Sequence, residues 1–132
     1  MRISYMINQE VKPAEVVRLF VNSGIHRPTN DLGRIRKMIK NANLTVSARD
    51  GKKLVGILRA LTDFSYCCYI SDLVVDKKYQ RQGIGKKMIY LATKTVGEQV
   101  MLLLLSSPEA DSFYSHIGLK KVENAWQIPR KK

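Results

Sequence analysis

The chain of 132 residues has few cysteines, few acidic residues and no long apolar segment. Its two cysteines, Cys67 and Cys68, are adjacent, so they cannot form a disulfide framework or a tetrahedral metal site. The longest apolar run, residues 100–105, is much shorter than the ~20 residues that a membrane helix needs. The first residues also lack the apolar core of a signal peptide. We therefore expect a soluble, cytoplasmic protein that binds no metal and no membrane.

Acidic residues number 11 against 23 lysines and arginines, which gives a net charge of +12. The excess is spread over both halves of the chain, so it is not confined to a detachable tail. A field of this sign favours anionic partners, such as nucleic acid or a phosphorylated ligand. The hydrophobic fraction of 45% and the length are ordinary for one globular domain, and we expect residues 1–132 to form it.

Hydrophobic spacing and turn residues predict the order β-α-α-β-β-β-α-β-α-β in a mixed α/β fold. The strands are expected at 2–7, 44–48, 53–61, 66–75, 100–105 and 121–128, and the helices at 13–21, 32–40, 84–96 and 109–116. Hairpins make most of the sheet antiparallel, whereas the helix between 66–75 and 100–105 implies one parallel pair. The run 100–105 is expected to be buried on both faces, and Trp126 is expected in the core.

The most informative segment is a glycine turn between the strand that ends at Val75 and the next helix. It contains Gln80, Gly83 and Gly85 in the spacing Q-x-x-G-x-G. Glycines let a ligand approach the backbone closely, and the first amides of a helix form an anion site. A P-loop is excluded because Gln80 stands where its first glycine is required. A dinucleotide fingerprint is excluded because its third glycine is replaced by Met88.

Together with a second motif, this turn resembles the acetyl-CoA site of the GCN5-related N-acetyltransferases, the GNAT family. The second motif is A-x-x-F-Y-x-x-x-G-L, which runs from Ala110 through Tyr114 to Leu119; the family more often has phenylalanine at the last position. The resemblance covers nearly the whole chain. It implies a mixed, mostly antiparallel sheet in which a splayed parallel pair of strands binds acetyl-CoA.

The resemblance also implies roles for individual residues. The cofactor pyrophosphate would bind the turn amides, and the pantetheine arm would pair with the preceding strand. Tyr114 would protonate the departing thiolate, and Ser107 stands where many members have an asparagine that bonds the pantetheine. The residues implied in cofactor binding are Leu73, Val74, Val75, Arg81, Gln82, Gly83, Ile84, Gly85, Lys86 and Ser107.

The expected reaction is direct attack by a primary amine on the acetyl group, in a complex with both substrates present. The acceptor would be a small-molecule or peptide amine, and the family resemblance also allows a homodimer. No general base stands out. Asp63, Asp72 and Asp111 are alternatives to a water-mediated base, although the period of a strand places Asp72 on the face opposite Tyr69 and Ser71. The same alternation of side chains along a strand points Cys67 and Cys68 to opposite faces of the sheet, so the two thiols cannot act together. This argues against a route through an acyl-cysteine.

Two alternatives to amine acetylation stay open at this point. One is a non-catalytic basic module of the same fold that binds nucleic acid, with a basic face that includes Arg34, Arg36, Lys37 and Lys40. The other is CoA sensing, or transfer of an acyl chain longer than acetyl.

Overall fold

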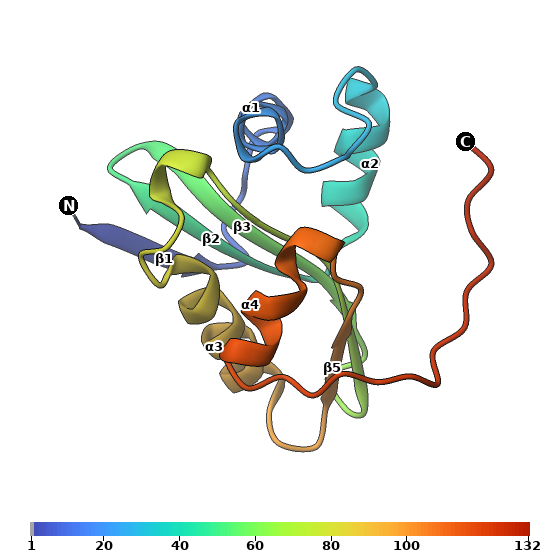
Figure 1. The fold of residues 1–132 in the computed structure, drawn as a ribbon. Coiled ribbons are helices and arrows are strands. Elements are labelled where there is room, and N and C mark those ends of the chain that lie inside the picture. Colours follow the sequence, from blue (N-terminus) through green and yellow to red (C-terminus); the bar gives the residue numbers. More distant parts are fainter. Residues whose placement is uncertain (1) are drawn as a thin grey trace.

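A computed structural model describes residues 2–132 and contains a five-stranded twisted sheet with helices on both faces (Figure 1). The spatial order of the strands follows the chain, from β1 to β5. The first four strands are antiparallel and β5 runs parallel to β4, which confirms the predicted mixed sheet. The strands are β1 (Ile3–Ile7), β2 (Leu44–Asp50), β3 (Lys53–Thr62), β4 (Cys67–Val75) and β5 (Met101–Leu104).

Two helical layers enclose the two halves of the core. Helices α1 (Pro13–Ser23) and α2 (Leu32–Asn41) cover one face of the sheet, where Phe20 and Ile35 are fully buried with Ile57 of β3. Helix α3 (Ile84–Val96) covers the other face through Met88 and other apolar residues of its inner side. Three short helical segments complete the structure: η1 (Lys77–Tyr79), η2 (Pro108–Ala110) and α4 (Asp111–His116). No helix among residues 2–132 is long and apolar enough to cross a membrane.

The ends of α1 and α2 follow local chemistry. Pro13 occupies the first turn of α1, where its missing N–H removes no helical hydrogen bond, and Gly24 ends the helix in a left-handed conformation with φ +82°. Asp31 caps α2 by accepting a hydrogen bond from the backbone amide of Arg34. The loop between Gly24 and Asp31 is therefore fixed at both ends, and it borders the site described below.

An irregularity in β4 changes which face of the sheet Asp72 occupies. The pairing with β3 shifts between Arg59 and Ala60, so that Asp72 lies opposite Arg59 whereas Ile70 lies opposite Ala60. Ser71 is the extra residue of this bulge, and an extra residue resets the alternation of side chains. Asp72 consequently lies on the same face as Tyr69, the face covered by α1 and α2. The prediction that Asp72 lies on the opposite face is wrong because it assumed an unbroken strand.

The C-terminal segment also differs from the prediction. Residues 119–132 contain no strand, and Figure 1 shows the segment leaving α4 and passing away from the sheet toward α2. The predicted strand at 121–128 is wrong because the segment forms no ladder with any described strand, and the side chain of Trp126 is 96% exposed instead of lying in the core. Its contact with the body includes a hydrogen bond from Arg34 to the carbonyl oxygen of Lys132.

Strand β5 is less buried than the apolar run 100–105 predicted. It has only four residues and lies at the edge of the sheet, where Met101 and the following Leu105 are exposed and the three leucines between them are partly buried. The two-faced burial expected of this strand is therefore wrong.

Candidate functional site

The site lies where β4 and β5 separate. The two strands pair only over Cys67–Ile70 and Met101–Leu104. Beyond this point Leu73, Val74 and Val75 pair with β3 on one side, and on the other side their backbone groups face a cavity of about 660 Å³. An unpaired strand edge offers backbone donors and acceptors to an extended ligand, which can add to the sheet like a further strand.

The turn before α3 forms one end of this cavity. Gly83 caps α3 in the left-handed region at φ +82°, and the first helical hydrogen bond runs from the Lys87 amide to the Gly83 carbonyl oxygen at 3.0 Å. The amides of Ile84, Gly85 and Lys86 precede that bond and have no acceptor within the helix. Together with the helix dipole they form an anion site.

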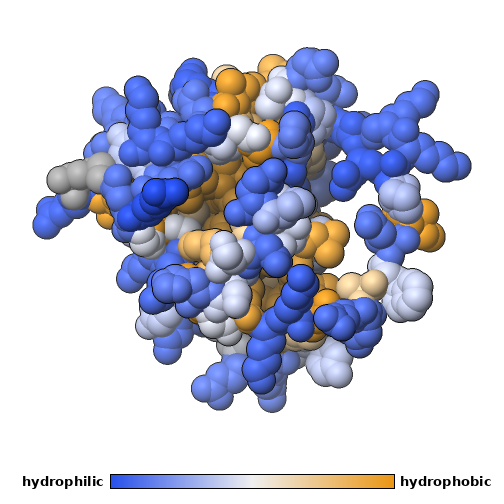
Figure 2. Space-filling view, in the orientation of Figure 1, coloured by the Kyte–Doolittle hydropathy of each residue, from blue (hydrophilic) through white to orange (hydrophobic). Residues whose placement is uncertain are grey.

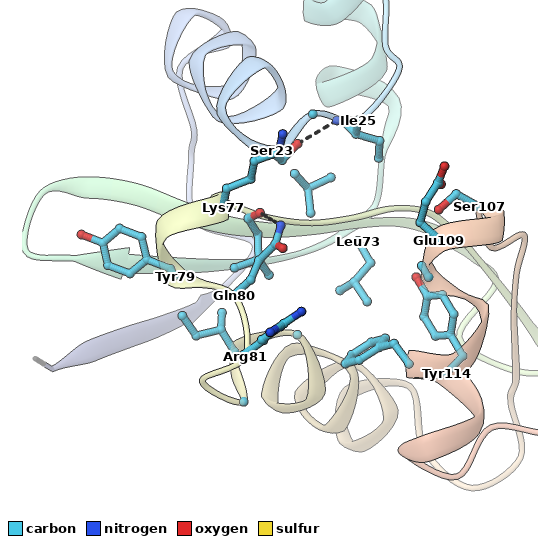
Figure 3. A pocket seen from close by; sticks show the side chains of 18 residues that line it. Ser23, Ile25, Leu73, Lys77, Tyr79, Gln80, Arg81, Ser107, Glu109 and Tyr114 are labelled. Carbon is cyan, nitrogen blue, oxygen red and sulfur yellow. Dashed lines mark hydrogen bonds between the residues drawn. The ribbon is translucent and has the colours of Figure 1, made fainter.

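Two further features shape the turn. Gln80 donates a side-chain hydrogen bond of 2.9 Å to the carbonyl oxygen of Val75, which ties the turn to the end of β4. Arg81 has a positive φ of 65° and lines the cavity, as does Lys77 (Figure 3). Arg81 therefore belongs to the turn that carries the free amides, whereas the Lys77 ammonium lies against Gly24 at the end of α1.

Gly85 is required by the contact between two helices. A Cβ atom built on Gly85 would lie 3.2 Å from Cζ of Phe113, which is tighter than an ordinary packing contact. The glycine therefore lets α4 dock against the first turn of α3, and the Phe113 ring in turn packs edge-to-face against Tyr114, with ring centroids 5.2 Å apart. The second glycine of the turn thus helps to position Tyr114.

Tyr114 lines the cavity at the side away from Arg81 (Figure 3). Burial raises the pKa of its phenol above the ordinary value of 10.0, so the hydroxyl keeps its proton at neutral pH. No hydrogen-bond partner of this hydroxyl occurs among residues 2–132, which leaves it free to donate to a ligand. Phe113 and the helix contact at Gly85 hold it in place.

Nine of the eleven residues expected at the site line this one cavity: Leu73, Val74, Val75, Arg81, Gly83, Ile84, Gly85, Ser107 and Tyr114. The side chains of Gln82 and Lys86 are exposed and do not line it, although their amides belong to the turn. The role of each residue toward a ligand stays a prediction.

Several residues that line the cavity were not predicted from the sequence. Ile25 comes from the α1–α2 loop, Lys77 from η1 and Glu109 from η2. Lys77 and Glu109 could have been found, because each stands within or beside one of the two motifs. Ile25 carried no such signal, since only the fold brings its loop to β4.

The three aspartates considered as bases are all occupied elsewhere. Asp72 is fully buried and pairs with both Arg27 and Arg59, while Asp111 accepts from Ser106 and pairs with Lys121. Asp63 accepts hydrogen bonds from three successive backbone amides, of which that of Tyr66 is the strongest, and these lower its pKa to about 2. None of the three lines the cavity.

The paired arginines also fix the wall of the site. Arg27 of the α1–α2 loop donates to Asp72 at 2.7 Å and to the backbone carbonyl of Ser71 at 2.8 Å. Both acceptors lie in the β4 bulge, so the loop that carries Ile25 is tied to β4 next to the open edge.

Cys67 is exposed and Cys68 is buried, as the alternation of side chains along a strand predicted, and neither lines the cavity.

Comparison with known proteins agrees with this geometry. A family model described as "Acetyltransferase (GNAT) domain" matches residues 9–127. A histone acetyltransferase of Glycine max is 26% identical over 106 residues, which cover 70% of this chain and 46% of that protein. The chain thus spans less than half the length of this relative and of a second one from the same plant.

Solved structures share the fold over the full chain. A probable acetyltransferase from methicillin-resistant Staphylococcus aureus superposes with a TM-score of 0.81 at 24% identity, covering 98% of this chain and all of that one. An aminoglycoside N-acetyltransferase solved with CoA has a TM-score of 0.73 at 12% identity, covering 99% of this chain and 96% of that one. At these identities the likeness concerns the fold.

Proposed function

This chain belongs to the GNAT acetyltransferase family, and from that premise we propose that it transfers an acetyl group from acetyl-CoA to a primary amine. The observation that carries the proposal is the continuity of one cavity. It runs from the free amides of α3 along the open edge of β4 to the hydroxyl of Tyr114.

The residues present fit acetyl-CoA part by part. The amides of Ile84, Gly85 and Lys86, with Arg81 beside them, would hold the pyrophosphate. The backbone of Leu73 to Val75 would hydrogen-bond the pantetheine arm, because this edge of β4 has no strand partner. Acetyl-CoA supplies an acetyl group that is activated as a thioester.

The chain's own residues would orient the reactants and supply one proton. The amine nitrogen forms a bond to the acetyl carbon, the carbon–sulfur bond breaks, and the sulfur leaves with the electron pair. Tyr114 is placed to give the sulfur a hydrogen bond or a proton, and a water molecule removes the proton that the amine loses. None of Asp63, Asp72 and Asp111 lines the cavity, so none of them is placed to act as the base.

Calorimetric titration with acetyl-CoA, and with ATP and NAD as anionic controls, tests the proposal. We expect micromolar binding of acetyl-CoA and at least tenfold weaker binding of the controls. Equal binding of all three would mean that the charge of +12 attracts anions without a specific site. Turnover of acetyl-, propionyl- and succinyl-CoA with an amine would then establish the acyl group.

A further inference from the structure

A single carboxylate among residues 2–132 lines the cavity, and it has no partner among them. Of the 11 acidic residues of the chain, Glu109 alone lines the cavity among the residues described. It accepts no hydrogen bond and forms no ion pair with any of residues 2–132, and its side chain is exposed. This sets it apart from Asp63, Asp72 and Asp111, each of which is held by other groups.

Glu109 lies at the end of the cavity where the acetyl group would be attacked. It belongs to η2, directly before the helix that carries Tyr114. Figure 3 shows its carboxylate directed toward the α1–α2 loop at Ile25, with Lys77 and Arg81 on the other side of the view. The cavity therefore has Arg81 at the turn before α3, the Lys77 ammonium at the end of α1, and a single carboxylate, that of Glu109, on the side from which Tyr114 also comes.

The same sheet face that α1 and α2 cover elsewhere is apolar and exposed at the end of β4 where Tyr69 lies. Tyr69 of β4 pairs with Leu61 of β3 and with Leu103 of β5, so the three side chains lie in a row on one face. Leu61 and Tyr69 are exposed, and Leu103 is partly buried. The row lies one residue before the last paired position of β4 and β5, immediately before the strands separate.

We propose that Glu109 binds the ammonium group of the acceptor, and that the acceptor is a primary amine with a single positive charge on an apolar, uncharged body. This inference rests on the proposed function and names the substrate class for the same site. One carboxylate can neutralise one ammonium group. A polyamine or an aminoglycoside would place further positive charges in a cavity that holds Lys77 and Arg81, on a protein with a net charge of +12.

Steady-state kinetics of Glu109→Gln test the assignment, with benzylamine as the monoamine and spermidine as the polyamine. Glutamine keeps the shape and removes the charge. We expect the KM for benzylamine to rise about tenfold, with kcat within threefold of wild type and an unchanged Kd for acetyl-CoA. The conservative variant Glu109→Asp should give an intermediate KM. For the wild type, kcat/KM for spermidine should be about tenfold lower than for benzylamine.

The pH profile separates binding from a merely structural role. A carboxylate next to an ammonium group raises the pKa of that ammonium, so its removal should move the rising limb of kcat toward lower pH. Glu98→Gln makes the same change of charge at an exposed position outside the cavity, and it should alter neither KM nor the profile.

Three results would overturn the assignment. An unchanged KM in Glu109→Gln would show that the carboxylate does not bind the acceptor. A hundredfold loss of kcat at constant KM would make Glu109 the general base instead. Faster acetylation of spermidine than of benzylamine, or no turnover of any monoamine, would refute the substrate class. Failure of the wild type to bind acetyl-CoA would instead refute the proposed function, and calorimetry detects it independently.

Discussion

Replacement of Asp72 by asparagine should destabilise the protein more than any other removal of a single charge. The Asp72 side chain is fully buried, and its two oxygens pair with Nε of Arg27 at 2.7 Å and Nε of Arg59 at 2.5 Å. Arg59 is itself buried, so Asp72→Asn would leave two neighbouring arginines without a counter-charge. Breaking a buried ion pair from one side costs about 3–5 kcal/mol.

Thermal and urea unfolding followed by circular dichroism measure this cost. An unfolding entropy of about 2.1 cal/mol/K per residue converts it to a fall in Tm of about 10–18 °C for a chain of this length. Asp111→Asn is the matched control, because the pair of Asp111 with Lys121 is mostly exposed, and its loss should cost less than about 1 kcal/mol. The milder variant Arg27→Met leaves Asp72 paired with Arg59 and should still fold.

The reasoning would be refuted if Asp72→Asn unfolded within about 1 kcal/mol of the wild type. That result would mean that the amide satisfies both arginines as well as the carboxylate does, so that burial of the pair carries little electrostatic energy. Arg27→Met provides a second test, because it frees the α1–α2 loop from the β4 bulge. It should raise the KM of the acceptor amine while leaving the Kd of acetyl-CoA unchanged.

Three further predictions concern Tyr114, the glycine cap and the tip of the β3–β4 hairpin. Tyr114→Phe should lower kcat at least tenfold at a nearly constant Kd for acetyl-CoA, and an unaltered kcat would leave the tyrosine with a packing role. Because burial raises the pKa of Tyr114, the activity of the wild type should not fall through ionisation of this phenol below pH ~10. Gly83→Ala should cost about 1–2 kcal/mol in stability, because Gly83 has a left-handed helical backbone and open space at Cβ. Its control Gly97→Ala should cost about 1–3 kcal/mol, because Gly97 has φ 90° and ψ 174°, a conformation that almost only glycine adopts. Only Gly83→Ala should weaken acetyl-CoA binding in calorimetry, and equal Kd values would remove the turn from the site. Asp63, with a pKa lowered to about 2 by backbone amides, contributes stability that is full above its unfolded pKa near 3.8 and is lost as the pH falls toward 2. Asp63→Asn should therefore flatten the loss of Tm between pH 5 and 2, and an unchanged slope would contradict this assignment.

The parts of the site that follow local rules could be predicted from the sequence. The turn at Gly83 follows a strand and begins a helix, and local conformation alone places its free amides at the strand end. The placement of Tyr114 at the site came instead from the family resemblance of the second motif, and the structure shows Tyr114 on the short helix α4, lining the same cavity. The opening of the β4 edge followed from the resemblance, and the structure shows it as the end of the pairing with β5.

The errors arose where position depends on partners distant in sequence. The segment 121–128 has the composition of a strand, but a strand also needs a neighbouring strand with a free edge to which it can hydrogen-bond. The sequence cannot show that this segment leaves the sheet. Trp126 was expected in the core for the same reason. The burial expected for residues 100–105 assumed cover on both faces, whereas β5 is an edge strand.

The bulge at Ser71 connects the stability of the fold with the arrangement of the site. Without the extra residue, Asp72 would point toward α3, and Arg27 would have no buried partner on β4. With it, one buried carboxylate holds the α1–α2 loop against β4 just before the edge at Leu73 opens. Because that carboxylate is fully occupied, it cannot serve the acceptor, and the exposed Glu109 is the acidic group left at the reacting end of the cavity. Structural and substrate-binding charges are thus carried by different residues, which is why Asp72→Asn should reduce stability and Glu109→Gln should change the KM for the amine.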